Sequence, residues 1–112
     1  MPRDLDYVRD MLLAARKIQV FTSGLTMAQF VNDERTHLAV IRLLEIIGEA
    51  AGKVSASYRN THPEVPWRAA TDTRNRLIHG YREVRLSIVW RTVTEDIPTL
   101  IAQLEPLVPP EE

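Results

Sequence analysis

The chain has 112 residues, of which 45% are hydrophobic and 26% charged, with a net charge of −1 and no cysteine. This composition is typical of a globular protein, and we expect residues 1–112 to form a single domain. The lack of cysteine excludes a disulfide framework, a thiolate zinc site and a cysteine nucleophile. The polar first ten residues and the lack of an apolar run of about 18 residues predict a cytoplasmic protein with no membrane partner.

The first half of the chain predicts two long helices with a short one between them. Apolar residues recur every three or four positions after Asp4, a suitable N-cap, and this helix should end near Gly24. One turn of helix, capped by Thr26, should follow. The second long helix should run from about Asp33 to Val54.

The second long helix carries two adjacent apolar stripes, which is more than one intramolecular core usually needs. One stripe contains Val40, Leu43, Ile47, Ala50 and Val54, and the other contains Ile41, Leu44, Gly48 and Ala51. Gly48 and Ala51 are small enough to let another backbone come close. The helix therefore packs either against a partner subunit as well as its own bundle, or in the middle of a monomer.

A proline-rich segment separates this helix from the next one. Residues 55–61 are polar and loop-like, with room for one helical turn. Pro63 forbids a continuous helix, whereas Pro66 suits the first position of a new one. That helix should run to His79 and stop at Gly80.

The last helix is expected over residues 86–104, where apolar side chains again recur at helical spacing. Pro98 lacks a backbone donor, so we expect a kink or a restart near Asp96. No segment alternates convincingly between polar and apolar residues. The sequence thus predicts an all-α bundle of four or five helices.

The three histidines are not spaced as metal ligands, because no pair is four residues apart. We expect His37 to lie on the surface and His62 to serve in a turn or in packing. His79 differs, because the segment from Arg68 to Arg91 holds six arginines and two acidic residues, a local charge of +4 that leaves −5 for the rest. Such a patch suits a focused phosphate site, although an arginine-rich solvated helix face is the plainer alternative.

His79 should occupy the last turn of its helix, where free carbonyls favour a protonated ring while nearby arginines oppose it. It can therefore act as an acid or a base near neutral pH. Arg74, Asn75 and Arg76 would donate to a phosphate. Arg74 lies about 140° around an ideal helix from His79, so it must reach round, use a frayed helix end or meet the histidine of another subunit. Capping cations at a helix end are the alternative reading.

Arg74, His79 and Tyr81 match the R-x4-H-x-Y motif of HepT-like toxins, which belong to the HEPN superfamily. Three further blocks resemble the same family: residues 44–51 its LEIIGEA helix, residues 62–67 its HPEIPW segment, and residues 89–93 its IVWETV helix. The resemblance extends from about residue 6 to residue 104. Thr73, where the family often has methionine, is a departure outside the motif.

The resemblance implies a ribonuclease that needs no metal and no cofactor. His79 would act as general base on the ribose 2′-hydroxyl or as general acid on the leaving oxygen, and Arg74 would stabilise charge on the phosphate. A 2′-hydroxyl nucleophile restricts the substrate to RNA. Asn75 would orient the site. The family builds its active site in a cleft between two subunits, which implies a homodimer.

The resemblance also implies a toxin of the HepT/MntA type VII toxin–antitoxin system. Its partner would be a MntA-like nucleotidyltransferase antitoxin that uses ATP as its own co-substrate and attaches AMP to Tyr81. The added bulk and negative charge would repel RNA; a packing aromatic is the other reading of Tyr81. The rival function is a non-catalytic accessory subunit of the nucleotidyltransferase that binds a nucleotide or RNA.

The remaining conspicuous side chains are expected to be structural. Trp67 and Trp90 suit core anchors better than base-stacking platforms. Glu45 and Glu49 share a helix face with flanking cations, which favours a solvated, ion-paired surface. A subsidiary hypothesis is that Glu49 orients an active-site arginine.

Overall fold

The computed structural model describes residues 3–80 and 84–110, and every regular element in these ranges is helical. This confirms the predicted all-α fold class. The elements are α1 (Arg3–Thr22), α2 (Met27–Asn32), α3 (Glu34–Lys53), α4 (Ala56–Thr61), α5 (Trp67–His79), α6 (Leu86–Arg91), the π-helix η2 (Thr92–Asp96), α7 (Ile97–Leu104) and the 3₁₀ turn η3 (Glu105–Leu107). In the described part of the chain, no helix combines the length and hydropathy that a bilayer crossing requires.

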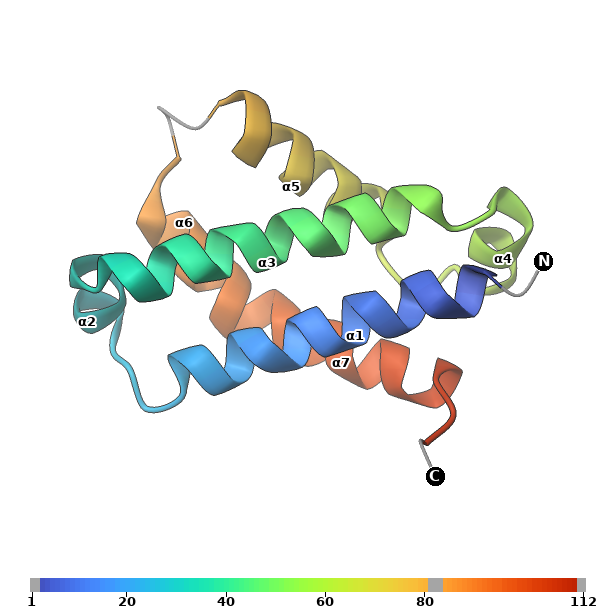
Figure 1. Ribbon diagram of the computed structural model, residues 1–112, viewed down its shortest axis with the longest axis horizontal. Coiled ribbons are helices and arrows are strands. Elements are labelled where there is room, and N and C mark those ends of the chain that lie inside the picture. Colours follow the sequence, from blue (N-terminus) through green and yellow to red (C-terminus); the bar gives the residue numbers. More distant parts are fainter. Residues whose placement is uncertain (1–2, 81–83, 111–112) are drawn as a thin grey trace.

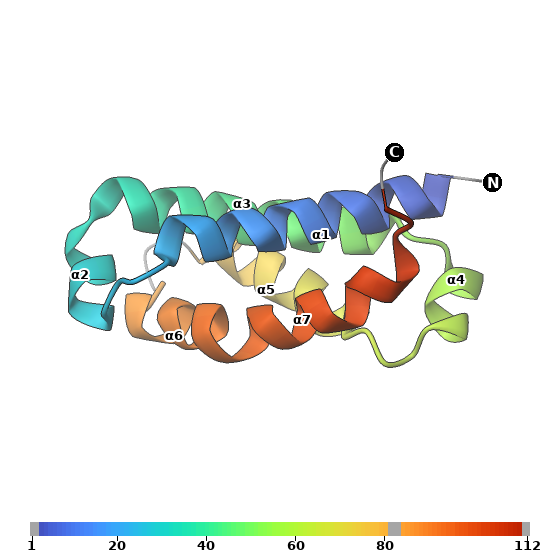
Figure 2. The same ribbon diagram turned by 90° about the horizontal axis from the view of Figure 1, so that it is seen from below.

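The helices form two layers. In Figure 1, α1 and α3 run side by side in opposite directions, and α5 lies on the far side of α3 from α1. Figure 2 shows that α6, η2 and α7 follow one another as a single rod beneath these two helices, with α2 and α4 at opposite ends of the bundle. The rod packs mainly on α1, whereas α5 packs mainly on α3.

The core lies where α1, α3 and the rod meet. The predicted apolar stripes supply it: the side chains that are at most 8% exposed include Val8, Met11, Leu12, Ala15, Ile18, Val40, Leu43, Leu44, Ile47, Val93, Ile97, Leu100 and Leu104. Phe30 of α2 is fully buried and closes one end, with its ring centroid 5.1 Å from that of Trp90. Each buried Val, Leu, Ile, Met or Phe side chain contributes about 1.5–3 kcal/mol through its removal from water.

The predicted helix starts are confirmed for α2 and α3 and wrong for α1. The hydroxyl of Thr26 accepts from Gln29 N and the Gln29 side chain accepts from Thr26 N, which is a complete capping box. Asp33 caps α3 by accepting from the backbone of Thr36. Asp4 instead lies inside α1, and its carboxylate accepts from both the backbone and the hydroxyl of Ser55, the residue that caps α4.

The two apolar stripes of α3 are both used within the chain, since α3 packs on α1 along one face and on α5 along another. Gly48 and Ala51 are buried, and Gly48 lies directly against α5. The close backbone approach that the small residues predicted is therefore present, with α5 of the same chain as the neighbour. This matches the reading of α3 as a central helix.

The predicted irregularity in the last helix is present and begins earlier than Pro98. The rod changes from α-helical to π-helical hydrogen bonding over Thr92–Asp96 and returns to an α-helix at Ile97. Pro98 has no amide hydrogen to donate to the carbonyl of Thr94, so the regular α-helical hydrogen bonding is interrupted in this stretch. Pro98 then occupies the first turn of α7, where that loss is tolerated.

Candidate active site

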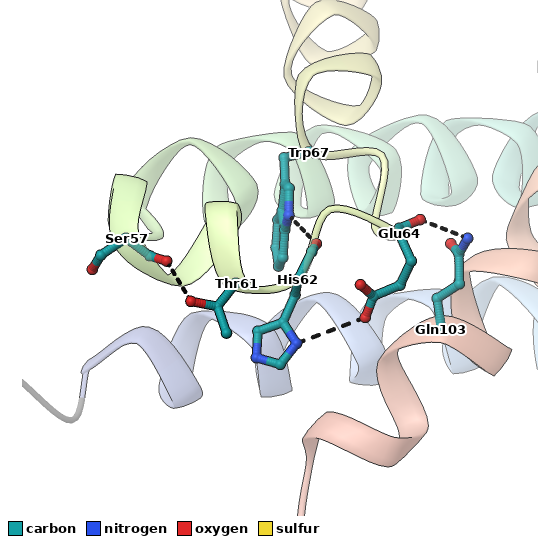
Figure 3. A network of polar contacts seen from close by, with 6 residues as sticks. All are labelled: Ser57, Thr61, His62, Glu64, Trp67 and Gln103. Carbon is teal, nitrogen blue, oxygen red and sulfur yellow. Dashed lines mark hydrogen bonds and ion pairs between the residues drawn. The ribbon is translucent and has the colours of Figure 1, made fainter.

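The start of α5 is fixed by the turn that precedes it. The indole nitrogen of Trp67 donates to the carbonyl oxygen of His62 at 2.9 Å, and Figure 3 shows the indole standing over that turn. Trp67 is 6% exposed, and its ring meets Tyr58 of α4 edge-on. The predicted structural roles of Trp67 and His62 are thus confirmed, and together they determine where α5 begins.

A second tie joins the same turn to the C-terminal rod. The side-chain amide of Gln103 donates to the backbone carbonyl of Glu64 at 2.8 Å, and the carboxylate of Glu64 lies 3.7 Å from Nδ1 of His62 (Figure 3). These contacts hold the turn against α7. The N-terminal end of α5 is therefore anchored to two other elements.

Arg74 lies at the contact between α5 and α3. Its side chain is partly buried, and its Nε atom is buried with no hydrogen-bond partner among the described residues. Its Nη1 atom donates to Oδ1 of Asn75 at 3.4 Å, which is long for a hydrogen bond. Arg74 is thus packed against Gly48 of α3, and among the described residues only its Nη1 atom has a hydrogen-bond partner.

His79 is exposed and is the last residue of α5. Gly80 caps the helix as predicted, and its N–H donates to the carbonyl of Arg76 at 2.8 Å. Its φ of −117° is outside the left-handed region that often ends helices. Five residues separate Arg74 from His79, so the two side chains leave α5 about 140° apart, and no hydrogen bond or ion pair in the described ranges joins them.

The other predicted site residues lie in different positions relative to Arg74. Asn75 is exposed on α5 and contacts Arg74, whereas Arg76 is exposed on the side of α5 that faces the rod. Tyr81, the residue expected to be modified, lies outside the described residues. The structure therefore brings Asn75 to Arg74 and leaves Arg76 and His79 on other faces of the helix.

A groove separates α5 from the C-terminal rod. Its larger part, of about 560 Å³, has an apolar floor that includes Leu77 and Val89, with Arg76, Arg85 and Arg91 on its walls. An adjoining part of about 290 Å³ continues toward α7, and the two parts share the lining residues Leu44, Ala69, Thr73, Thr92 and Asp96. The groove thus runs along α5 with most of its cations at the His79 end.

The arginine-rich segment is spread over several surfaces of the molecule. Arg76, Arg85 and Arg91 line the groove, whereas Arg68 lies near the other end of α5, beside Arg59. Asp72 and Asp96 also line the groove, so its net charge is modest. Among the residues that the structure describes, no three histidine, cysteine, aspartate or glutamate side chains are grouped to hold a metal ion.

The remaining candidates have structural surroundings. His37 is half-buried rather than on the surface, with Nδ1 3.3 Å from the carbonyl oxygen of Phe30. The predicted ion-paired face of α3 is confirmed, because Arg42 lies 3.3 Å from Glu45 and Lys53 lies 3.5 Å from Glu49. The contact of Glu49 is thus with Lys53, and the hypothesis that it orients an arginine gains no support.

Comparisons with known proteins agree with one another. A family model described as ribonuclease HepT-like matches residues 11–107. A protein named "Probable ribonuclease HepT" from Thermococcus cleftensis is 42% identical over 102 residues, covering 91% of this chain and 93% of that protein. A "Putative RNase" from Methanocaldococcus jannaschii is 34% identical, covering 91% and 84%, and another from Caldanaerobacter subterraneus is 36% identical, covering 80% of each. No solved structure matches significantly.

Proposed function

The chain belongs to the HepT-like ribonuclease family, and from this membership we propose that it is a metal-independent ribonuclease whose reacting groups are Arg74 and His79. The observation that carries the proposal is the setting of these two residues on α5. Arg74 is packed against Gly48 of α3 and, among the described residues, only its Nη1 atom has a hydrogen-bond partner, whereas His79 is exposed at the helix end. A fixed cation and an accessible imidazole are the two groups that phosphodiester cleavage requires.

In the proposed reaction, one His79 takes the proton from a ribose 2′-hydroxyl as its oxygen attacks the adjacent phosphorus. The bond from phosphorus to the leaving oxygen breaks, and water supplies the proton that this oxygen needs. The guanidinium of Arg74 donates to the non-bridging oxygens, on which negative charge accumulates in the transition state. Asn75, which already contacts Arg74, would keep the guanidinium oriented, and Arg76 would bind a neighbouring phosphate.

The active site would form between two copies of the chain. Within one chain the side chains of Arg74 and His79 leave α5 about 140° apart, which is unsuited to holding a single phosphate. A homodimer in which two α5 helices face each other would place the arginine of one subunit near the histidine of the other. The dimer would thus supply both residues to the same phosphate.

The physiological setting proposed is a HepT/MntA type VII toxin–antitoxin pair. A MntA-like nucleotidyltransferase would transfer AMP from ATP to the hydroxyl of Tyr81, two residues after His79, and release pyrophosphate. The added phosphate would carry negative charge at a residue only two positions along the chain from His79, which would oppose RNA binding. ATP would serve the antitoxin, and this chain would need no cofactor.

The test compares the wild type with His79→Ala and Arg74→Ala, each produced without an antitoxin and incubated with total cellular RNA in EDTA. We expect cleavage by the wild type and its loss in both variants. Arg68→Ala is the matched control, because it removes an exposed arginine from the other end of α5 and should cleave normally. No cleavage by the wild type, with its mass showing an unmodified Tyr81, would overturn the proposal in favour of a non-catalytic accessory subunit.

A further inference from the structure

α3 and α5 approach each other closely at Gly48. A methyl group built on this glycine would lie 2.5 Å from the carbonyl oxygen of Ala70 and 3.1 Å from Cγ of Arg74, and closer still to Cβ of Arg74. A backbone oxygen and a Cβ atom cannot move by rotation of a side chain, so any residue larger than glycine would push α5 away from α3. The first side-chain atoms of Arg74 therefore pack directly against the backbone of α3.

We propose that Gly48 is a positioning residue for Arg74. The backbone of α3 at Gly48 would fix the Cβ and Cγ atoms of the arginine and thereby the position of its guanidinium. This inference rests on the proposed function, in which Arg74 stabilises the transition state. Gly48 itself would touch neither RNA nor the reacting atoms. Its contribution is the lack of a side chain at this one place.

The structure contains a control on the same helix. Gly52 lies one turn after Gly48 and also faces α5, but a methyl group there would meet only the hydroxyl of Thr71 at 3.9 Å, an ordinary contact. Glycine is a poor helix former compared with alanine, so both glycines weaken α3. Of these two glycines, only Gly48 has no room for a side chain, because Ala70 and Arg74 of α5 lie against it.

The burial of the arginine makes its position sensitive to a shift of α5. The Nε atom of Arg74 is already buried without a partner, so the side chain runs through a confined space between the helices. Displacing its root by about 1 Å would move the guanidinium by at least as much, and a misplacement of this size can lower turnover about 100-fold. The binding of RNA through Arg76 should change far less.

The experiment compares Gly48→Ala with Gly52→Ala in RNA cleavage, with helicity and thermal melting measured on the same samples. We expect kcat to fall about 100-fold in Gly48→Ala with little change in KM, and to stay near the wild-type value in Gly52→Ala. Wild-type kcat in a folded Gly48→Ala variant would overturn the inference while the ribonuclease function stands. A wild type that cleaves no RNA would instead remove the proposed function.

A double variant separates positioning from general damage to the fold. If Gly48 acts through Arg74, adding Gly48→Ala to Arg74→Ala should cause no further loss of single-turnover cleavage. A second loss of similar size would show that Gly48 acts on the fold as a whole and would overturn the inference.

A measurement on the wild type keeps the inference testable even where Gly48→Ala does not fold. The Nε–H group of Arg74 should show an NMR order parameter near the rigid-backbone value of about 0.85, whereas exposed Arg68 should fall below about 0.6. An Arg74 as mobile as Arg68 would mean that nothing fixes its side chain, and the inference would fail.

Discussion

Mixing two inactive subunits would show whether Arg74 and His79 act on the same phosphate from different chains. Arg74→Ala removes the guanidinium and keeps the imidazole, and His79→Ala does the reverse. In a mixed dimer with a site that combines the arginine of one subunit with the histidine of the other, one site has both groups and the second has neither. The purified mixed dimer should therefore show about half of the wild-type activity.

The assay uses subunits co-expressed with two different affinity tags, so that only mixed dimers pass both columns. The matched control pairs Arg74→Ala with the double variant Arg74→Ala, His79→Ala, in which no combination restores both groups. A site shared between two chains is expected from the exposed position of His79 and from the angle of about 140° between it and Arg74 on α5. A mixed dimer as inactive as its control, or an active wild-type monomer, would refute it.

Two further predictions concern the turn and the cap that hold the helices in place. Trp67→Phe removes the 2.9 Å hydrogen bond to the carbonyl of His62, which still accepts from the backbone of Val65 at 3.3 Å. We therefore expect urea denaturation to show a loss of about 1–2 kcal/mol in the free energy of unfolding, against about 3–5 kcal/mol for Trp67→Ala. An unchanged free energy of unfolding in Trp67→Phe would show that the hydrogen bond contributes nothing. The hydrogen bonds from the Ser55 hydroxyl and backbone hold the pKa of Asp4 below its usual value of 3.8, so its contribution to stability is present above that value and is lost as the pH falls through the lower, folded-state pKa. Thermal melting should therefore separate the wild type from Asp4→Asn at pH 7 and bring them together in acid, and a separation that persists at the lowest pH would contradict this.

Much of the fold could be predicted from the sequence because local signals and global packing agree. Helical spacing located α1, α3 and the C-terminal rod, and capping residues such as Thr26 and Asp33 located two helix starts. The role of Asp4 could not be predicted, because its partner Ser55 is 51 residues away. A residue that can cap its own helix can equally bind another element once the chain has folded.

The candidate site was predicted as a set of residues, and their mutual placement was not. Spacing along one helix predicts that Arg74 and His79 leave it in different directions, but it cannot say which of them faces the bundle. The neighbour of Gly48 could not be identified from the sequence either, because a small residue predicts that another element comes close without showing which element it is. The structure shows that this element is α5 of the same chain, at Arg74.

The two ends of α5 differ in a way that suits a site shared between subunits. At its N-terminal end the buried indole of Trp67 and the contact between Gln103 and Glu64 join the helix to the turn and to α7. At its C-terminal end His79 is exposed, and the next residue, Gly80, lines the groove that separates α5 from the rod. A residue that must stabilise charge gains from being fixed, whereas one that must reach the phosphate held by another copy gains from exposure. The same helix can thus present a fixed arginine within one subunit and an accessible histidine to its neighbour.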